Sequence, residues 1–144
     1  MPEQGKTRIR VVGYPMSPPT AGAHYAADHI AAKYGDRFET AYHFSLAWAA
    51  FAVELTKDVT FPAELKGHCT SPYVQLETRN ADGGVTVVPI GGFQPNFADW
   101  CKKTFPDDKE LAGLVSKVPG FTKVAHTFTG AEGTAPTAPE TKNE

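Results

Sequence analysis

The sequence predicts an α/β fold built on a mixed sheet of about four strands, with helices packed against it. Two observations predict this fold. In the first half of the chain, short β-branched or aromatic segments alternate with a longer segment of helical periodicity, which is typical of a β-α-β unit. In the second half, two strand-like segments flank a glycine-rich turn, which is typical of an antiparallel hairpin. A sheet that contains both units is mixed.

The first strand is predicted at residues 8–14, a short segment rich in β-branched residues. The first helix is predicted at residues 21–34, where alanines and one isoleucine recur at helical spacing. Ser17 suits the N-cap of this helix and Pro18 its first position, because proline lacks the N–H that would go unpaired there. Gly35 ends the helix.

The second strand is predicted at residues 38–44, where aromatic side chains alternate with other residues. A connection of helical length joins it to the first strand, so the two strands should be parallel and the crossover right-handed. Ser45 is predicted to cap a second helix at residues 46–57. The apolar face of this helix comprises Trp48, Phe51, Ala52 and Leu55.

The hairpin is predicted from strands at residues 73–77 and 85–90, joined by the turn at residues 80–84. Pro89 lies near the end of the second of these strands, which indicates a strand at the edge of the sheet.

Two more helices are predicted, at residues 93–105 and 107–118. Large apolar residues occur at helical spacing on the middle helix and on the first of these two. We expect four of their side chains to be largely buried against the sheet: Trp48, Phe51, Phe97 and Trp100.

The overall composition excludes several functional classes. The chain has 144 residues and a formal net charge of −2, which gives no electrostatic reason to bind nucleic acid or an anionic membrane. No apolar run of about 18 residues and no secretory leader is visible, so we expect a cytoplasmic protein. The five histidines show no metal-ligand spacing, and we expect neither a metal nor a cofactor. Cys69 and Cys101 form no CxxC motif and are interpreted as reduced bystander thiols.

The composition changes near residue 120, so we predict a domain at 1–119 and a tail at 120–144, disordered or bound to a partner. Residues 130–144 contain no apolar side chain larger than alanine and cannot offset their ordering entropy by burial. Phe121, Val124 and Phe128 are spaced as i, i+3 and i+7, which predicts a short segment that contacts a partner protein. The alternative is a solvated tail with incidental apolar residues.

The segment Ser17-Pro18-Pro19-Thr20 lies between the first strand and the first helix. A cysteine there would gain acidity from the helix N-terminus, starting from a pKa of about 8.5. A serine hydroxyl ionises closer to ~15.7, the value for water. The difference is about 10 kcal/mol, and a helix dipole supplies only ~1 kcal/mol. We therefore expect no thiol–disulfide exchange and interpret Ser17 as a helix cap. A hydrolase would need a base, and His24 completes no visible triad.

The order of these segments resembles the glutaredoxins of the thioredoxin-like superfamily, over roughly residues 8–105. Glutaredoxins carry Cys-Pro-x-Cys where this chain has residues 17–20, so the resemblance implies a three-layer fold with a degenerate redox site. It also implies that Ser71-Pro72 is a cis-proline edge, which pairs with substrate backbone in that superfamily. Gly91-Gly92 would correspond to the loop that receives the glutathione carboxylate. Gln94-Pro95 departs from that pattern, so we expect a vestigial loop that does not bind glutathione.

A closer resemblance rests on residues 70–74, on Val88-Pro89-Ile90-Gly91-Gly92-Phe93 and on the Trp48 helix. These segments are similar to the N-terminal glutaredoxin-like domain of ciliary malate-dehydrogenase-like (type B) proteins. The resemblance implies a setting in the cilium or flagellum, at the axoneme. The dehydrogenase activity of that family does not carry over, because the chain has no Rossmann motif.

These observations predict a redox-inactive interaction module, a structural subunit that binds protein partners in a larger assembly such as the axoneme. The alternative is a glutathione-dependent enzyme of the glutaredoxin/glutathione-transferase group. Such an enzyme would use Ser17 or Tyr14 to hold a bound thiolate. The two hypotheses differ at the glycine loop, where an enzyme should bind glutathione.

Overall fold

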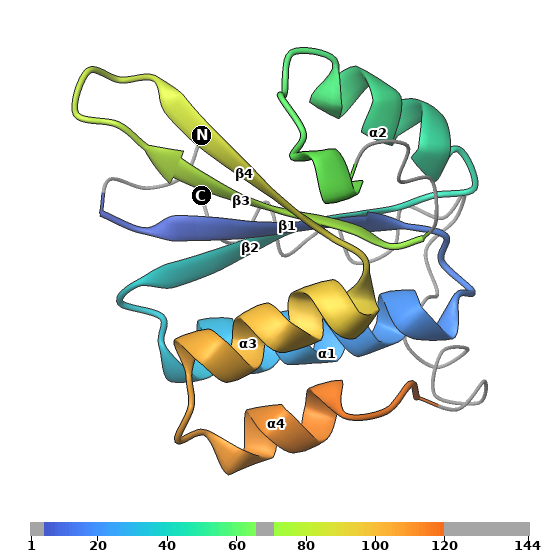
Figure 1. Cartoon of the computed structure of the whole chain (residues 1–144), viewed down its shortest axis with the longest axis vertical. Coiled ribbons are helices and arrows are strands. Elements are labelled where there is room, and N and C mark those ends of the chain that lie inside the picture. The colour runs from blue at the N-terminus through green and yellow to red at the C-terminus, as the bar shows by residue number, and fades with distance from the viewer. Residues whose placement is uncertain (1–4, 66–70, 120–144) are drawn as a thin grey trace.

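A computed structural model of the chain describes residues 5–65 and 71–119. Its sheet has four strands in the order β2-β1-β3-β4 (Figure 1). β1 pairs in parallel with β2, while β3 is antiparallel to both β1 and β4. This mixed sheet flanked by helices is compatible with the thioredoxin-like α/β fold, as the sequence predicts. The strands are β1 (Thr7–Gly13), β2 (Phe38–Phe44), β3 (Tyr73–Arg79) and β4 (Val85–Gly91).

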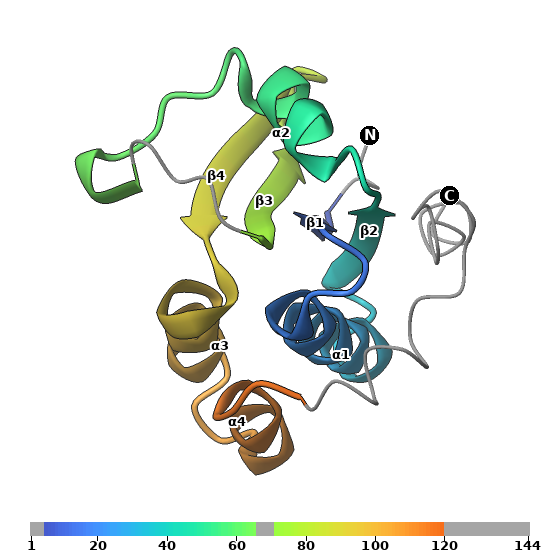
Figure 2. The same ribbon diagram turned by 90° about the vertical axis from the view of Figure 1, so that its right-hand side faces the viewer.

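The helices lie on both faces of the sheet. α1 (Pro18–Lys33) and α3 (Ala98–Thr104) cover one face, and α4 (Lys109–Val115) packs against them from outside (Figures 1 and 2). α2 (Trp48–Thr56) lies on the opposite face. The helical turns at Ala63–Leu65 and Phe93–Phe97 complete the described elements. No described helix is both long and apolar enough to span a bilayer.

The start of α1 forms as the sequence predicts. Ser17 has an extended backbone, and its side chain accepts a hydrogen bond from the Thr20 N–H at 3.4 Å. Pro18 and Pro19 occupy the first turn, where their missing N–H groups remove no helical hydrogen bond. Gly22 is required by packing, because a Cβ there would lie 2.5 Å from the ring of Phe93. The small residues of α1 therefore let the helix lie close to the sheet and to the segment that leads into α3.

The core lies between the sheet and the layer of α1 and α3. Ile9 and Val11 of β1 and Val74 of β3 are fully buried there, together with Phe97 and Cys101. Aromatic rings fill the rest of this layer, and their edge-to-face contacts join β2 to α3.

Three of the four aromatic side chains predicted to be buried are only partly so. Phe97 is fully buried, whereas Trp48, Phe51 and Trp100 are half-buried. The periodicity of α2 correctly identified its inward face, but no residue of that helix is buried.

The start of α2 differs from the prediction, in which Ser45 caps a helix that begins at residue 46. The Ser45 hydroxyl accepts a hydrogen bond from the Ala47 N–H, and the helix begins only at Trp48.

The single helix predicted at residues 93–105 is interrupted at Gln94, whose φ of −124° and ψ of 135° are extended. Proline disfavours the helical conformation of the residue before it, and Pro95 follows directly. Regular α-helix therefore begins only at Ala98. The last predicted helix is α4, which is shorter than expected and is capped by Asp108.

Asp108 joins α4 to α1. Its side chain accepts hydrogen bonds from the Leu111 N–H at 2.9 Å, from the Tyr34 hydroxyl at 2.8 Å and from His29 at 2.9 Å. The positively charged Lys33 Nζ lies 3.4 Å from the Asp108 Oδ2. Burial alone would raise the pKa of Asp108, but the hydrogen bonds and the attraction of His29 outweigh it and hold the pKa well below its usual range.

We predict that Phe97→Ala lowers the free energy of unfolding by about 3–5 kcal/mol, because it leaves a cavity in the packed layer. Denaturant unfolding of the full chain measures this loss. Val53→Ala is the control, because Val53 is 70% exposed on α2 and its truncation should cost less than about 0.5 kcal/mol. Equal losses would show that the Phe97 face is not core.

We also predict an acid-sensitive contribution from Asp108. Since its folded pKa is depressed, the stabilisation is complete above the unfolded value of about 3.9 and is lost as pH falls below it. The stability advantage of the wild type over Asp108→Asn should therefore shrink between about pH 5 and pH 2. Urea unfolding across this range, with the exposed Asp107→Asn as control, measures the difference. An advantage that does not vary with pH would contradict the role of the carboxylate.

Candidate functional site

Three hydroxyl groups meet where α1 begins and β3 is about to start. The Thr20 Oγ1 lies 2.7 Å from the Ser71 Oγ, and the Tyr14 N–H donates to that same Ser71 oxygen at 2.8 Å. The third hydroxyl, on Ser17, caps α1 through the Thr20 N–H. Thr20 is fully buried, while Ser17 and Ser71 are half-buried. We call Ser17, Thr20 and Ser71 the hydroxyl cluster.

Gly13, the last residue of β1, makes the cluster possible. A Cβ on Gly13 would lie 2.5 Å from the Thr20 Oγ1 and 2.7 Å from the Ser71 Oγ, which is closer than real contacts allow. Any larger residue would push the two hydroxyls apart. The sequence alone does not mark Gly13 as a site residue, since a glycine at a strand end is usually a turn residue.

Among the described residues, the hydroxyl cluster has no base beside it that would activate a nucleophile. His24 directs its Nε2 toward Asp28, 3.1 Å away on the next turn of α1, and its ring packs against Tyr42 and Phe44. The Ser17 hydroxyl serves as the helix cap. The prediction that Ser17 is a cap agrees with the geometry, and nothing in the described residues arranges a hydrolase triad around it.

The one cysteine among the described residues is unsuited to thiol chemistry. Cys101 is fully buried on α3. Burial, with a smaller effect from the charge of Asp108, raises the pKa of its thiol to about 12. The thiolate that would act as a nucleophile is therefore disfavoured at neutral pH. Cys69 lies outside the described residues, as do the predicted partner contacts Phe121, Val124 and Phe128 and the predicted tail at 120–144.

The three segments that the glutaredoxin resemblance singled out meet at one pocket. The Ser71–Pro72 peptide bond is cis, as the resemblance implied. A pocket of about 290 Å³ lies beside it. Its lining includes Pro19 and Ser71 from the first two segments, Gly92 and Gln94 from the glycine loop, and the neighbours Phe93 and Val118.

The glycine loop is already hydrogen-bonded within the chain. The Gly92 N–H donates to the Asn96 Oδ1 at 3.2 Å, and the Gln94 side chain donates to the Val115 carbonyl at 2.8 Å. Gly91 has a φ of +116°, a conformation that favours glycine. A carboxylate that bound this loop would have to displace Asn96 from the Gly92 N–H. Asn96 was not predicted from sequence, because the backbone N–H that its side chain accepts from depends on how the loop folds.

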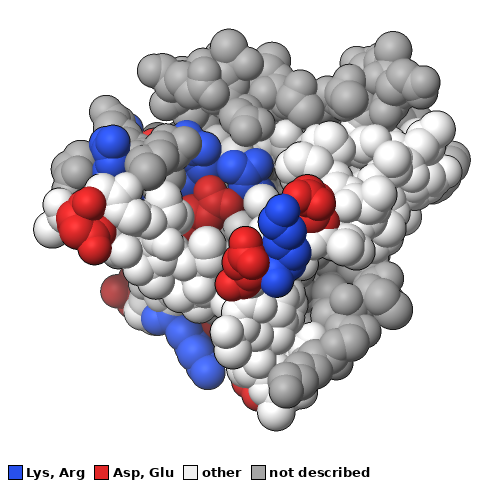
Figure 3. Space-filling model, turned by 90° about the horizontal axis from the view of Figure 1, so that it is seen from above, with Lys and Arg blue, Asp and Glu red and all other residues white. Residues whose placement is uncertain are grey.

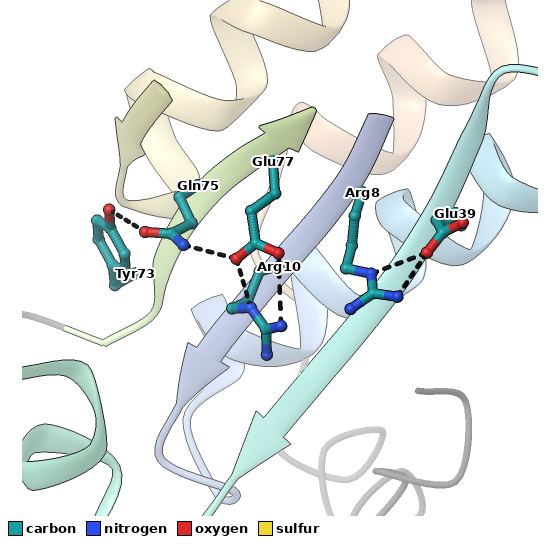
Figure 4. A network of polar contacts seen from close by, with 6 residues as sticks. All are labelled: Arg8, Arg10, Glu39, Tyr73, Gln75 and Glu77. Carbon is teal, nitrogen blue, oxygen red and sulfur yellow. Dashed lines mark hydrogen bonds and ion pairs between the residues drawn. The ribbon is translucent and has the colours of Figure 1, made fainter. Parts of the chain in front are cut away.

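A second polar array covers the sheet face opposite α1 and α3 (Figure 4). Arg8 on β1 donates to Glu39 on β2 at 2.8 Å, and both side chains are only 4% exposed. Arg10 donates to Glu77 on β3 at 2.6 Å. The array continues along β3, where Tyr73 donates to Gln75 and Gln75 donates to Glu77.

This array was also missed from sequence, although its signal is visible. Arg8 and Arg10 are two residues apart, and so are Tyr73, Gln75 and Glu77, so each set shares one face of its strand. Burial, and to a lesser extent the charge of Glu77, raises the pKa of Tyr73 far above its usual value, so its hydroxyl remains a donor. The paired charges make this a structural network between strands.

Groups of three histidine, cysteine or acidic residues that could hold a metal ion do not occur in the described part of the chain.

Comparison of the chain with protein families, curated proteins and solved structures found no match.

We predict that the full chain reduces neither a glutathione mixed disulfide nor insulin disulfides, because residues 17 and 20 are serine and threonine and provide no thiol. A turnover assay with a dithiol glutaredoxin as positive control tests this. Turnover that disappears in Ser17→Ala would contradict the prediction. Turnover that disappears in Cys69→Ser instead would assign the chemistry to that thiol.

Proposed function

We propose that this protein is a redox-inactive, thioredoxin-like interaction module and a structural subunit of a larger protein assembly. The single observation that carries the proposal is the surface of α2, an apolar helix in which no residue is buried. The hydroxyl cluster supports the other half of the proposal, because the Thr20 and Ser71 hydroxyls are bonded to each other and the Ser17 hydroxyl caps α1.

The apolar character of α2 extends around most of the helix. Every residue from Trp48 to Thr56 is apolar except Glu54 and Thr56 itself. Val53 is 70% exposed, and Leu46, just before the helix, is 62% exposed. A helix that is hydrophobic on all sides normally lies in a protein interior. In Figure 3, which views the molecule from above Figure 1, an uncharged area lies beside acidic and basic groups.

An apolar pocket extends this surface. It has a volume of about 130 Å³ and lies between α2, Phe61 and the ring of Tyr73. Exposed apolar patches bordered by polar groups mark sites of protein–protein contact. The occupant we propose is the apolar surface of a partner protein, which would bury α2 as a core helix is buried.

The proposed setting is the axoneme of a cilium or flagellum. This part of the proposal rests on the resemblance to the glutaredoxin-like domain of the ciliary malate-dehydrogenase-like proteins. The formal net charge of −2 supports protein partners over nucleic acid. The alternative, an enzyme that binds glutathione at the glycine loop, has less support, because Asn96 already occupies the Gly92 N–H.

The proposal is tested by affinity capture from ciliated cells with the full chain as bait. We predict that Val53→Lys reduces recovery of the wild-type partners at least tenfold, because a buried interface would have to desolvate the new charge. Thr104→Lys adds the same charge at the exposed end of α3 and should retain them. Equal recovery with both variants, at unchanged melting temperature, would exclude α2 as the partner surface.

A further inference from the structure

β4 is an edge strand with features that favour pairing. Its neighbour on one side is β3, and no described strand lies on its other side. The sequence from Val85 to Gly91 is rich in β-branched residues and contains no charge. Val85 and Val88 are 37% and 47% exposed. In an edge strand, alternate N–H and C=O groups point away from the sheet and are available to another strand.

Edge strands are usually protected against such pairing by lysines, prolines or bulges. In β4 the protection lies at one end only. Pro89 is near the C-terminal end, and the register irregularity between Val74 and Gln75 of β3 lies beside it. Residues 85–88 keep a regular register with residues 76–79 of β3. This half of the edge therefore combines regular geometry with exposed apolar side chains.

A hollow of about 300 Å³ next to the edge carries charges of both signs. Its lining includes Ile90 and the half-buried Trp100, and also Glu64, Asp99 and Lys103. None of these three charged groups forms an ion pair with another residue of the described ranges. An apolar centre with opposite charges around it is self-complementary, since a two-fold axis can bring the lysine of one copy to the carboxylates of the other.

We propose that β4 pairs antiparallel with β4 of a second copy of this chain, so that one sheet runs through a two-fold dimer. The uncharged strands face each other without like-charge repulsion. The surface is separate from α2 and from the hydroxyl cluster. The inference is therefore independent of the proposed function and adds a self-association surface to it.

Sedimentation velocity of the full chain over a range of concentrations tests the dimer. Val88→Lys places a lysine from each copy at the paired edge, and the dissociation constant of the dimer should rise at least tenfold. The matched control is Val53→Lys, a valine-to-lysine change on α2 that should leave the dimer unchanged. Thermal melting checks that each variant is folded.

Hydrogen exchange of the wild type provides a second measurement that needs no variant. Amides among residues 85–88 should exchange more slowly as protein concentration rises, because pairing protects the outward N–H groups. A wild type that is monomeric at every concentration overturns the proposal. The proposal is also overturned if Val88→Lys still dimerises and residues 85–88 show no protection that grows with protein concentration. A dimer that Val53→Lys dissociates and Val88→Lys does not would likewise overturn it.

Discussion

The site depends on one chain of hydrogen bonds, from the Tyr14 N–H to the Ser71 Oγ and from there to the Thr20 Oγ1. These bonds tie the end of β1 to the first turn of α1 and to the loop that enters β3. They form only because Gly13 leaves room for both hydroxyls. The resemblance of the sequence to glutaredoxins would place a reactive cysteine pair in this segment. Here its polar groups satisfy one another.

The polar groups are also paired at the glycine loop and on the sheet face opposite α1 and α3. Asn96 occupies the Gly92 N–H, and Arg8 is neutralised by Glu39 on the neighbouring strand. The Gly92 N–H and the Arg8–Glu39 pair are thus engaged within the chain. Exposed apolar residues lie on α2 and along β4, and apolar surfaces are recognised by other proteins. These exposed apolar residues are the basis on which we propose a protein that binds partners.

Local sequence signals predicted much of the fold. Ser17 and Pro18 mark the start of α1, and the alternation at residues 38–44 matches β2 to its exact ends. Periodicity identified which face of α2 points inward, but it could not show how little of the structure covers that face, because burial depends on distant segments. The extended backbone of Gln94 could have been predicted from Pro95, because proline disfavours the helical conformation of the residue before it. The hydrogen bond of Asn96 could not be predicted, because its partner depends on how the loop folds.

The central claim is that the site is closed by internal hydrogen bonds and does not bind glutathione. Titration of the ¹⁵N-labelled full chain with reduced glutathione, followed by the amide signals of Tyr14, Ser71 and Gly92, tests it most directly. The account predicts no saturable shift of these three signals at millimolar glutathione. Saturable shifts of all three, with Gly92 released from Asn96, would contradict it and would favour the glutathione-dependent enzyme.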